Sequence, residues 1–218
     1  MICLSTKIIL YLIYLLIYLY KFIYYKLIIQ TKLSYMEVIN SIIEGVKLIC
    51  PDIHTDDRGY FYESFNQAKF ESDVNSFNSI KFVQDNESKS AKNTIRGFHW
   101  QKGSNAQAKL VRCTHGAIID YVIDLRKDSS TFGQHIHAVL SADNHLQLFM
   151  PRGCAHGFIA LKDDTIFQYK CDNYYNKESE CGLHYSYVDW PIDISEAIIS
   201  DKDKQHPSFE ELDPTNLF

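Results

Sequence analysis

The chain has 218 residues, of which 46% are hydrophobic, and it carries 22 basic and 27 acidic side chains. This length suits one domain with room for an appendage. Residues 1–35 hold four lysines and no acid, so the remainder has 18 basic residues (22 less four) against 27 acidic ones, a net charge of −9. This net negative charge argues against general nucleic-acid binding, although local Arg and Lys can still bind a phosphate ligand.

The first 35 residues differ in composition from the rest. Residues 8–20 are an unbroken run of Ile, Leu and Tyr, and Lys21 interrupts it before residues 22–25. As a helix this run spans about 20 Å, and extension through Lys21 gives about 27 Å, against a hydrocarbon core of about 30 Å. One interpretation is a signal anchor, whose following lysines would keep the body cytoplasmic.

The alternative is that residues 1–35 are an upstream stretch wrongly joined to a protein that starts at Met36. The segment is low in complexity and biased towards Ile, Tyr, Leu and Lys, and ordinary globular sequence begins at Met36. Both interpretations divide the chain into a hydrophobic segment over 1–35 and one domain over 36–218. A membrane partner is expected only if the first segment is a real anchor.

From Met36 onward the pattern predicts an all-β domain. Short runs rich in Val, Ile, Tyr and Phe are separated by turn residues. The predicted strands are 46–49, 59–64, 80–84, 109–113, 117–124, 135–140, 147–150, 157–161 and 165–171. A spacing of about ten residues with little helical period predicts a cupin-type jelly-roll β-barrel. A short helix is expected within 68–78, and one or two short C-terminal helices are expected over the barrel mouth within 194–218.

Six cysteines are scattered along the chain, with no C-x-x-C pair and no spacing typical of a zinc site. We expect them to be small buried residues with free thiols in a reducing compartment. They are Cys3, Cys50, Cys113, Cys154, Cys171 and Cys181.

The strongest chemical signal is the stretch Arg96–Gln101, RGFHWQ, which places His99 near a cation. Lys109, Tyr169 and the pair Lys202-Asp203 follow it. A base, an ammonium and a phenol are the groups that move a proton beside a carbonyl. The base removes the proton, the cation stabilises the enolate oxygen, and the phenol returns a proton from the other face. His titrates near neutrality and is therefore the natural base.

Further motifs surround this stretch in a fixed order. They are DRGYFYES at 57–64, FVQDN at 82–86, KLVRC at 109–113, DLRK at 124–127, TFGQ at 131–134, AHGF at 155–158, YK at 169–170, NYY at 173–175 and WP at 190–191. Over about residues 36–205 the chain resembles the dTDP-4-dehydrorhamnose 3,5-epimerase family. The many motifs in one order make this resemblance specific.

The resemblance implies a dTDP-linked 4-keto-6-deoxyhexose as substrate and inversion at C3 and C5, which turns dTDP-4-dehydro-6-deoxy-D-glucose into dTDP-4-dehydro-L-rhamnose. It implies neither a cofactor nor a metal. His99 matches the family's base, and Asp203 matches the carboxylate that orients it. Lys109 matches the cation near the developing enolate oxygen, and Tyr169 matches the acid that reprotonates the opposite ring face.

Substrate-binding residues are implied in the same way. Arg58 and Arg96 match the diphosphate contacts, for which a planar guanidinium is suited. Tyr174 or Tyr175 would stack on the thymine. Arg58 also lies in a segment that reaches the partner subunit's site in this family, so a homodimer is implied. Other contacts to the nucleotide sugar are matched by Glu63, Gln84, Asn86, His156, Glu180 and Lys202.

Other functions remain open at this stage. His135-x-His137 places two possible ligands on one face of a strand, as in a metal-dependent cupin oxygenase, but no Glu follows at ligand spacing. A non-catalytic sugar-binding barrel would not need the set of acid and base residues. Within the family, epimerisation of a single carbon, or of a sugar on another nucleotide, is an alternative that sequence does not decide.

Overall fold

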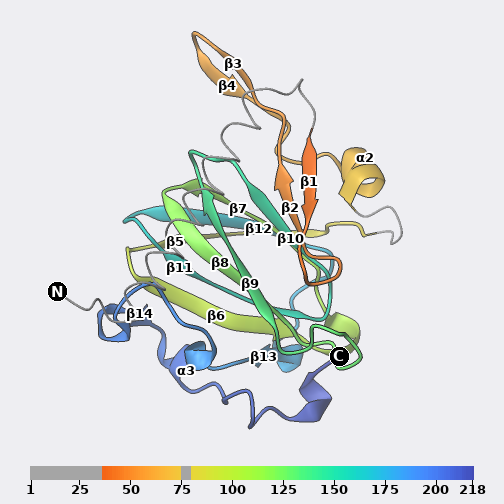
Figure 1. Cartoon of the computed structure of the whole chain (residues 1–218), viewed down its shortest axis with the longest axis vertical. Coiled ribbons are helices and arrows are strands. Elements are labelled where there is room, and N and C mark those ends of the chain that lie inside the picture. The colour runs from red at the N-terminus through yellow and green to blue at the C-terminus, as the bar shows by residue number, and fades with distance from the viewer. Residues whose placement is uncertain (1–35, 75–79) are drawn as a thin grey trace, which may run out of the picture. The chain divides into compact units, whose positions relative to one another are not determined.

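The computed structural model describes residues 36–74 and 80–218, which form mainly antiparallel strands (Figure 1). One sheet has the order β1-β2-β10-β7-β12-β5, with bounds Glu37–Asn40, Lys47–Cys50, Gln147–Met150, Lys109–His115, Thr165–Cys171 and Gln84–Ser90. The second has the order β13-β6-β11-β8-β9, with bounds Glu180–Gly182, Thr94–Gln101, Cys154–Ala160, Ala117–Asp124 and His135–Ser141. A short strand β14 (Ile198–Ile199) pairs parallel to β6.

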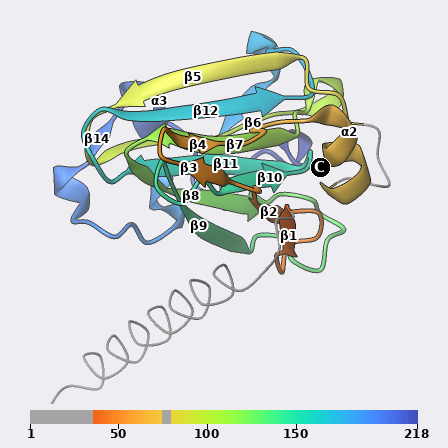
Figure 2. The ribbon, with the colours of Figure 1, turned by 90° about the horizontal axis from the view of Figure 1, so that it is seen from above.

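The two sheets face each other across one interior, which confirms the predicted all-β jelly-roll barrel. Figure 2 shows β5 and β12 on one side of this stack and β8 and β9 on the other. Alternate residues of each strand point inward, so Val111 on β7 and Phe167 on β12 join one buried cluster with Val122 and Phe158. Full burial of a Phe such as Phe167 contributes about 1.5–3 kcal/mol, so this cluster holds the two sheets together.

The outer faces of both sheets are also covered. Leu110, which points away from the interior, packs with Phe70 and Phe149 in a cluster under the helical turns α2 (Gln67–Lys69) and η1 (Phe70–Val74). The other sheet is covered by the C-terminal segment, where Phe98 and Tyr121 pack near Trp190. The C-terminal segment is therefore part of the packed fold.

The helical elements follow the sequence expectation in outline. The helix expected within 68–78 is present as α2 and η1, and residues 75–79 lie outside the described part. Asn66 caps α2 by accepting hydrogen bonds from the backbone N–H groups of Ala68 and Lys69. The C-terminal region forms short helices, as expected, but within 194–218 there are three of them: η5 (Ile194–Glu196), α3 (Asp201–Lys204) and η6 (Pro214–Asn216). The remaining turns are η2 (Gly103–Asn105), η3 (Lys177–Ser179) and η4 (Tyr185–Tyr187).

The strand predictions were incomplete, because β1, β3 (His54–Asp56), β6, β13 and β14 were not expected. The strand expected at 80–84 in fact begins at Gln84 and runs through polar residues to Ser90, and β6 over 94–101 was not expected at all. On β5 the residues at alternate positions are partly buried and exposed, and all are polar. Because one face lines a cavity and the other meets solvent, neither face carries the apolar signal that identifies a strand.

A hairpin of β3 (His54–Asp56) and β4 (Gly59–Phe61) stands away from the barrel (Figure 1). The strand predicted over 59–64 is therefore shorter than expected. The hairpin residues are exposed, and Tyr60 and Phe61 keep 60% and 69% of their surface accessible. Large apolar side chains that are exposed close together can mark an interaction surface.

The expectations for the hydrophobic N-terminal segment and for the cysteines have different outcomes. The hydrophobic segment over 1–35, and with it Cys3 and the anchor hypothesis, lies outside the described residues. Among the residues that are described, no helix is long and apolar enough to cross a membrane. The five described cysteines are free thiols, and all but Cys50 are buried, as expected.

A close approach between β6 and β11 predicts a sensitive position. Their register shifts between His156 and Phe158, and at the intervening Gly157 a β-carbon would lie 2.9 Å from the carbonyl oxygen of Arg96 and 2.9 Å from Cδ1 of Phe98. We expect Gly157→Ala to lower the free energy of unfolding by about 1–3 kcal/mol, because the strands would have to separate. Urea denaturation would measure this, and an unchanged midpoint would contradict the close approach.

Candidate active site

A cavity of about 820 Å³ opens between the two sheets near α3. It is lined by inward-facing residues of β5, β6, β7, β11 and β12 and by residues of β14, α3 and the segment before β13. Among them are Gln84, Asn86, Ser88, Thr94, Arg96, His99, Gln101, Lys109, His156, Tyr169, Tyr175, Glu180, Ser200, Lys202 and Asp203. Most predicted site residues therefore meet in one place, although they come from distant parts of the chain.

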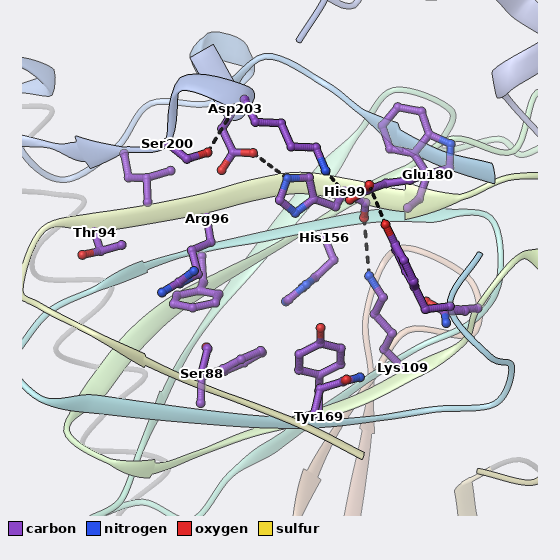
Figure 3. A pocket seen from close by; sticks show the side chains of 18 of the residues that line it. Ser88, Thr94, Arg96, His99, Lys109, His156, Tyr169, Glu180, Ser200 and Asp203 are labelled. Atoms are coloured by element: carbon purple, nitrogen blue, oxygen red, sulfur yellow. Dashed lines mark hydrogen bonds and ion pairs between the residues drawn. The ribbon is translucent and has the colours of Figure 1, made fainter. Parts of the chain in front are cut away.

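His99 is tied to a carboxylate from the C-terminal segment. Its Nε2 lies 2.6 Å from Oδ1 of Asp203, a residue 104 positions later in the chain. The side chain of Asp203 is only 5% exposed, whereas that of His99 is 32% exposed. With Nε2 held by Asp203, the second ring nitrogen, Nδ1, faces the cavity (Figure 3). His99 can therefore accept a proton from a molecule in the cavity while Asp203 stabilises the resulting imidazolium.

Asp203 is held in its charged form. Burial by itself would raise the pKa of Asp203, but contacts with His206 and His99 outweigh this effect and hold the pKa well below its ordinary value. The backbone N–H of Gly97 adds a hydrogen bond of 3.4 Å to the other carboxylate oxygen. Ser200 caps α3 by accepting the N–H of Asp203, which places the carboxylate over β6.

Tyr169 lies on the opposite wall of the cavity, and its hydroxyl points toward His99 (Figure 3). Burial raises the pKa of Tyr169 to about 12. A phenol with this pKa remains protonated at neutral pH and can donate a proton rather than accept one. The cavity thus has a base on one wall and an acid on the other.

Lys109 supplies a buried cation beside this pair. It is 8% exposed, and its Nζ donates a 3.5 Å hydrogen bond to the carbonyl oxygen of His99. Burial lowers the pKa of Lys109, because the ammonium has lost much of its hydration. An anion that develops nearby would restore the missing stabilisation, so Lys109 is placed to support negative charge.

His156 forms a second imidazole–carboxylate pair. It stands opposite His99 in the register of β6 and β11, and its Nε2 lies 2.8 Å from Oδ2 of Asp120. Both groups are buried, and burial raises the pKa of Asp120 and lowers the pKa of His156. The pair therefore favours a shared proton over full charge separation, and it holds the His156 ring at the cavity wall.

The predicted binding residues at the cavity form two groups. Arg96 is anchored on one side by hydrogen bonds to Ser90 and to the backbone of Lys89. On the other side, Lys202 contacts Glu180 at 2.5 Å, and Glu180 accepts a 3.0 Å hydrogen bond from the Tyr175 hydroxyl.

Gln84 links this second group to β5. It accepts a hydrogen bond from the backbone N–H of Tyr175 and donates one to Asn86, each 3.0 Å long. Asn86 stands opposite Tyr169 in the register of β5 and β12. Polar groups therefore continue from the acid–base pair to the rim.

Three predicted residues do not line this cavity. Arg58 lies in the turn of the β3–β4 hairpin with its side chain 90% exposed, where it pairs with Asp56. Glu63 pairs with Lys69 and accepts a hydrogen bond from Asn66. Tyr174 is 67% exposed, whereas Tyr175 lines the cavity. Of the two tyrosines, only Tyr175 is thus placed at the cavity within a single copy of the described chain.

Sequence reasoning missed Asp120 and His206, the partners of His156 and Asp203. The sequence contains a signal for Asp120, because an acidic residue inside the apolar run 117–124 is rarely buried without a partner. His206 left none, since a histidine in a polar tail is ordinary. Its role depends on where the tail folds.

The structure does not place His135 and His137 at the cavity, where the metal-dependent oxygenase alternative would need them. His135 and His137 lie exposed on β9, an edge strand, and neither lines the cavity. Among the described residues, the group with metal-ligand spacing is His99, Asp203 and His206, whose ligand atoms lie within 4.8 Å of one another. The 2.6 Å contact between His99 and Asp203 has the length of a strong hydrogen bond, so these two are already paired.

Comparisons with known proteins identify the family. A family model described as dTDP-4-dehydrorhamnose 3,5-epimerase matches residues 40–211. The dTDP-4-dehydrorhamnose 3,5-epimerase of Escherichia coli K12 is 48% identical over 181 residues, covering 81% of this chain and 96% of the relative.

Solved structures are similar as well. The dTDP-6-deoxy-D-glucose-3,5-epimerase of Legionella pneumophila, in complex with dTDP-4-keto-L-rhamnose, has a TM-score of 0.79 and 38% identity, covering 84% of this chain and 97% of that one. A 3′-monoepimerase from Streptomyces bikiniensis, in complex with dTDP-quinovose, has a TM-score of 0.71 and 30% identity, covering 77% and 85%.

The charge of Asp203 gives a pH-dependent prediction. Because its folded-state pKa lies below the ordinary 3.8, its charge stabilises the fold above that pH, and this stabilisation is lost as the pH falls below it. Each pH unit in this window removes about 1.4 kcal/mol. We expect Asp203→Asn to lose less stability than the wild type between pH 4 and pH 3 in urea denaturation.

The matched control is Asp201→Asn on the same helical turn, where the side chain is 92% exposed. It should keep the wild-type slope of stability against pH. Equal slopes for wild type and Asp203→Asn would show that the carboxylate is not held in its charged form.

Proposed function

This chain belongs to the dTDP-4-dehydrorhamnose 3,5-epimerase family, and we propose that it inverts C3 and C5 of dTDP-4-dehydro-6-deoxy-D-glucose to form dTDP-4-dehydro-L-rhamnose. The observation that carries this proposal is the arrangement of a paired imidazole and a protonated phenol on opposite walls of one cavity. Inversion beside a ketone needs one group on each face of the sugar ring.

In the first step His99 removes the proton from the carbon next to the C4 ketone. The electrons of the C–H bond move into the carbonyl and form an enolate, and the proton passes to the Nδ1 of His99. Asp203 accepts the hydrogen bond from Nε2 and stabilises the imidazolium. Lys109 lies beside His99 and would stabilise the oxygen that becomes negative.

In the second step Tyr169 donates its proton to the opposite face of the same carbon. Its high pKa keeps the hydroxyl protonated until the carbanion character of the enolate makes transfer favourable. His99 then carries a proton and Tyr169 has lost one. Both must exchange with solvent before the other carbon reacts, so hydrogen from water enters the product at each inverted carbon.

The rim of the cavity suits the nucleotide diphosphate. Arg96 and Lys202 are cations at opposite ends of the site, and a guanidinium anchored through Nε keeps its outer nitrogens oriented. Tyr175 is exposed beside Glu180 and offers a ring face for the thymine. Gln84 and Asn86 supply amide groups to the same region.

We further propose that the active form is a homodimer in which the β3–β4 hairpin completes the site of the other copy. Arg58 is a predicted diphosphate contact, yet it is exposed and does not line the cavity of its own chain. The exposed Tyr60 and Phe61 on the same hairpin would be buried by such an exchange. Burial of two aromatic side chains at about 2 kcal/mol each would favour the association.

Epimerisation at a single carbon is the alternative within this family. The solved 3′-monoepimerase is 30% identical to this chain, whereas the Escherichia coli 3,5-epimerase is 48% identical. Counting the carbons that take up deuterium from heavy water separates the two, since only the double epimerase labels both C3 and C5.

Replacement of the acid should separate exchange from inversion. We expect Tyr169→Phe to form epimerised product at least about 100-fold more slowly, because no proton reaches the opposite face. His99 can still remove and return a proton on its own face, so deuterium should enter the unchanged substrate. His99→Ala should lose both reactions. NMR of the dTDP-keto-sugar in heavy water measures both rates.

The control for this experiment is Tyr187→Phe. The Tyr187 hydroxyl donates a hydrogen bond to the backbone of Gly133 and does not line the cavity, so product should form at the wild-type rate. Product formation at the normal rate by Tyr169→Phe would refute the assignment of the acid.

The dimer predicts complementation between two inactive variants. Arg58→Ala and His99→Ala should each have little activity alone. In a mixed dimer, the subunit with an intact His99 receives the intact Arg58 of its neighbour, so coexpression should restore about a quarter of wild-type activity by random assortment. If Arg58 acts within its own chain, no mixture regains activity. Sedimentation velocity would give the assembly state of each sample.

A further inference from the structure

His206, in the segment after α3, is placed against the catalytic pair without lining the cavity. Its ring packs edge-on against the ring of His99, with centroids 5.5 Å apart and an interplanar angle of 78°. Its Nε2 lies 3.5 Å from Oδ1 of Asp203, the same oxygen that lies 2.6 Å from His99. One carboxylate oxygen therefore faces two imidazoles.

The position of His206 is set by its surroundings. Its ring covers Gly182, where an added β-carbon would lie 2.3 Å from the ring atoms. Gly182 stands opposite His99 in the register of β13 and β6. The backbone of Pro207, the next residue, accepts a 2.8 Å hydrogen bond from His184. With 14% of its side chain exposed, His206 is thus confined beside the pair.

We propose that His206 is a positioning residue for the base: it shares the Asp203 carboxylate with His99 and so sets how strongly that carboxylate supports His99. This inference rests on the proposed function, in which His99 removes the substrate proton. A donor or cation at His206 draws on the negative charge of Asp203, which leaves less of that charge to stabilise protonated His99. His206 also limits rotation of the carboxylate away from His99.

The charged and titratable groups around His206 support a pH readout. Asp203 on α3 and His99 on β6 face it directly, and β13 contributes the uncharged Gly182 beneath its ring. Beyond His99 lies Glu180, which is paired with Lys202. Removal of His206 takes away both the ring nitrogen that lies 3.5 Å from the Asp203 carboxylate, too far for a normal hydrogen bond, and any positive charge on that ring. Either loss makes His99 easier to protonate, so the effects act in the same direction.

The test compares His206→Phe, which keeps a ring over Gly182 but no donor, with the wild type. We expect kcat to fall about fivefold, because the Asp203 carboxylate is freer to rotate away from His99. KM should stay within about twofold, because His206 does not line the cavity. The midpoint of the acid limb of kcat/KM should move to higher pH by about half a unit to one unit. His206→Gln, which restores a donor, should move the midpoint back towards the wild-type value.

The control variant is His115→Phe, at the exposed end of β7, which should match the wild type in kcat and in pH profile. NMR titration of the His99 ring in each variant gives a readout that does not depend on turnover. Thermal unfolding checks that each variant folds, and His206→Leu, which also lacks a donor, replaces His206→Phe if that variant does not.

The outcomes separate the two proposals. A wild-type protein that does not turn over the keto-sugar refutes the proposed function, and the His99 titration still decides whether His206 acts on it. An active wild type with an unshifted acid limb and unshifted His99 titration in His206→Phe overturns only the positioning role. A fall in kcat without either shift also overturns it, because loss of structure alone would produce that result.

Discussion

The hydrogen bond between His99 and Asp203 joins two parts of the chain that must fold together before the proposed base is oriented. His99 lies on β6 in one wall of the barrel, and Asp203 lies on a short turn 104 residues later. The C-terminal segment packs on the outside of the β6 sheet, and α3 then brings the carboxylate over the strand to the cavity. In the proposed mechanism the packing of that segment is therefore a condition for catalysis, because an unpaired His99 would lack both its orientation and its counter-charge.

The inward-facing side chains of the barrel form both an apolar core and a polar cavity. Val111 and Phe167 belong to the buried cluster, and Lys109 and Tyr169 lie two residues away on the same faces of the same strands. The change from apolar to polar along each strand places the reactive groups at one end of a dry core. Low polarity there is the physical cause of the shifted pKa values of Lys109 and Tyr169, since burial penalises the charged form of each.

Two imidazole–carboxylate pairs in one cavity have different electrostatic roles. The pair of His99 and Asp203 reaches the solvent-accessible space and has a strongly acidic carboxyl group. The pair of His156 and Asp120 is buried, and burial favours its uncharged form. The first arrangement suits repeated proton transfer, and the second suits a fixed wall that donates or accepts hydrogen bonds. The two pairs contain the same residue types, so the difference between their roles comes from their environments.

The amino-acid sequence by itself determined the all-β class and most of the strands, and it identified the candidate acid and base residues, because alternating apolar residues and an ordered series of motifs are local signals. It did not reveal β6, and it missed most of β5, whose residues are all polar and so lack an apolar pattern. Only the tertiary structure decided that Arg58 lies outside the cavity of its own chain, that Asp120 supports His156, and that His206 reaches Asp203. These relations join residues that are distant in the chain, and contacts of that kind exist only once the sheets and the C-terminal segment have packed.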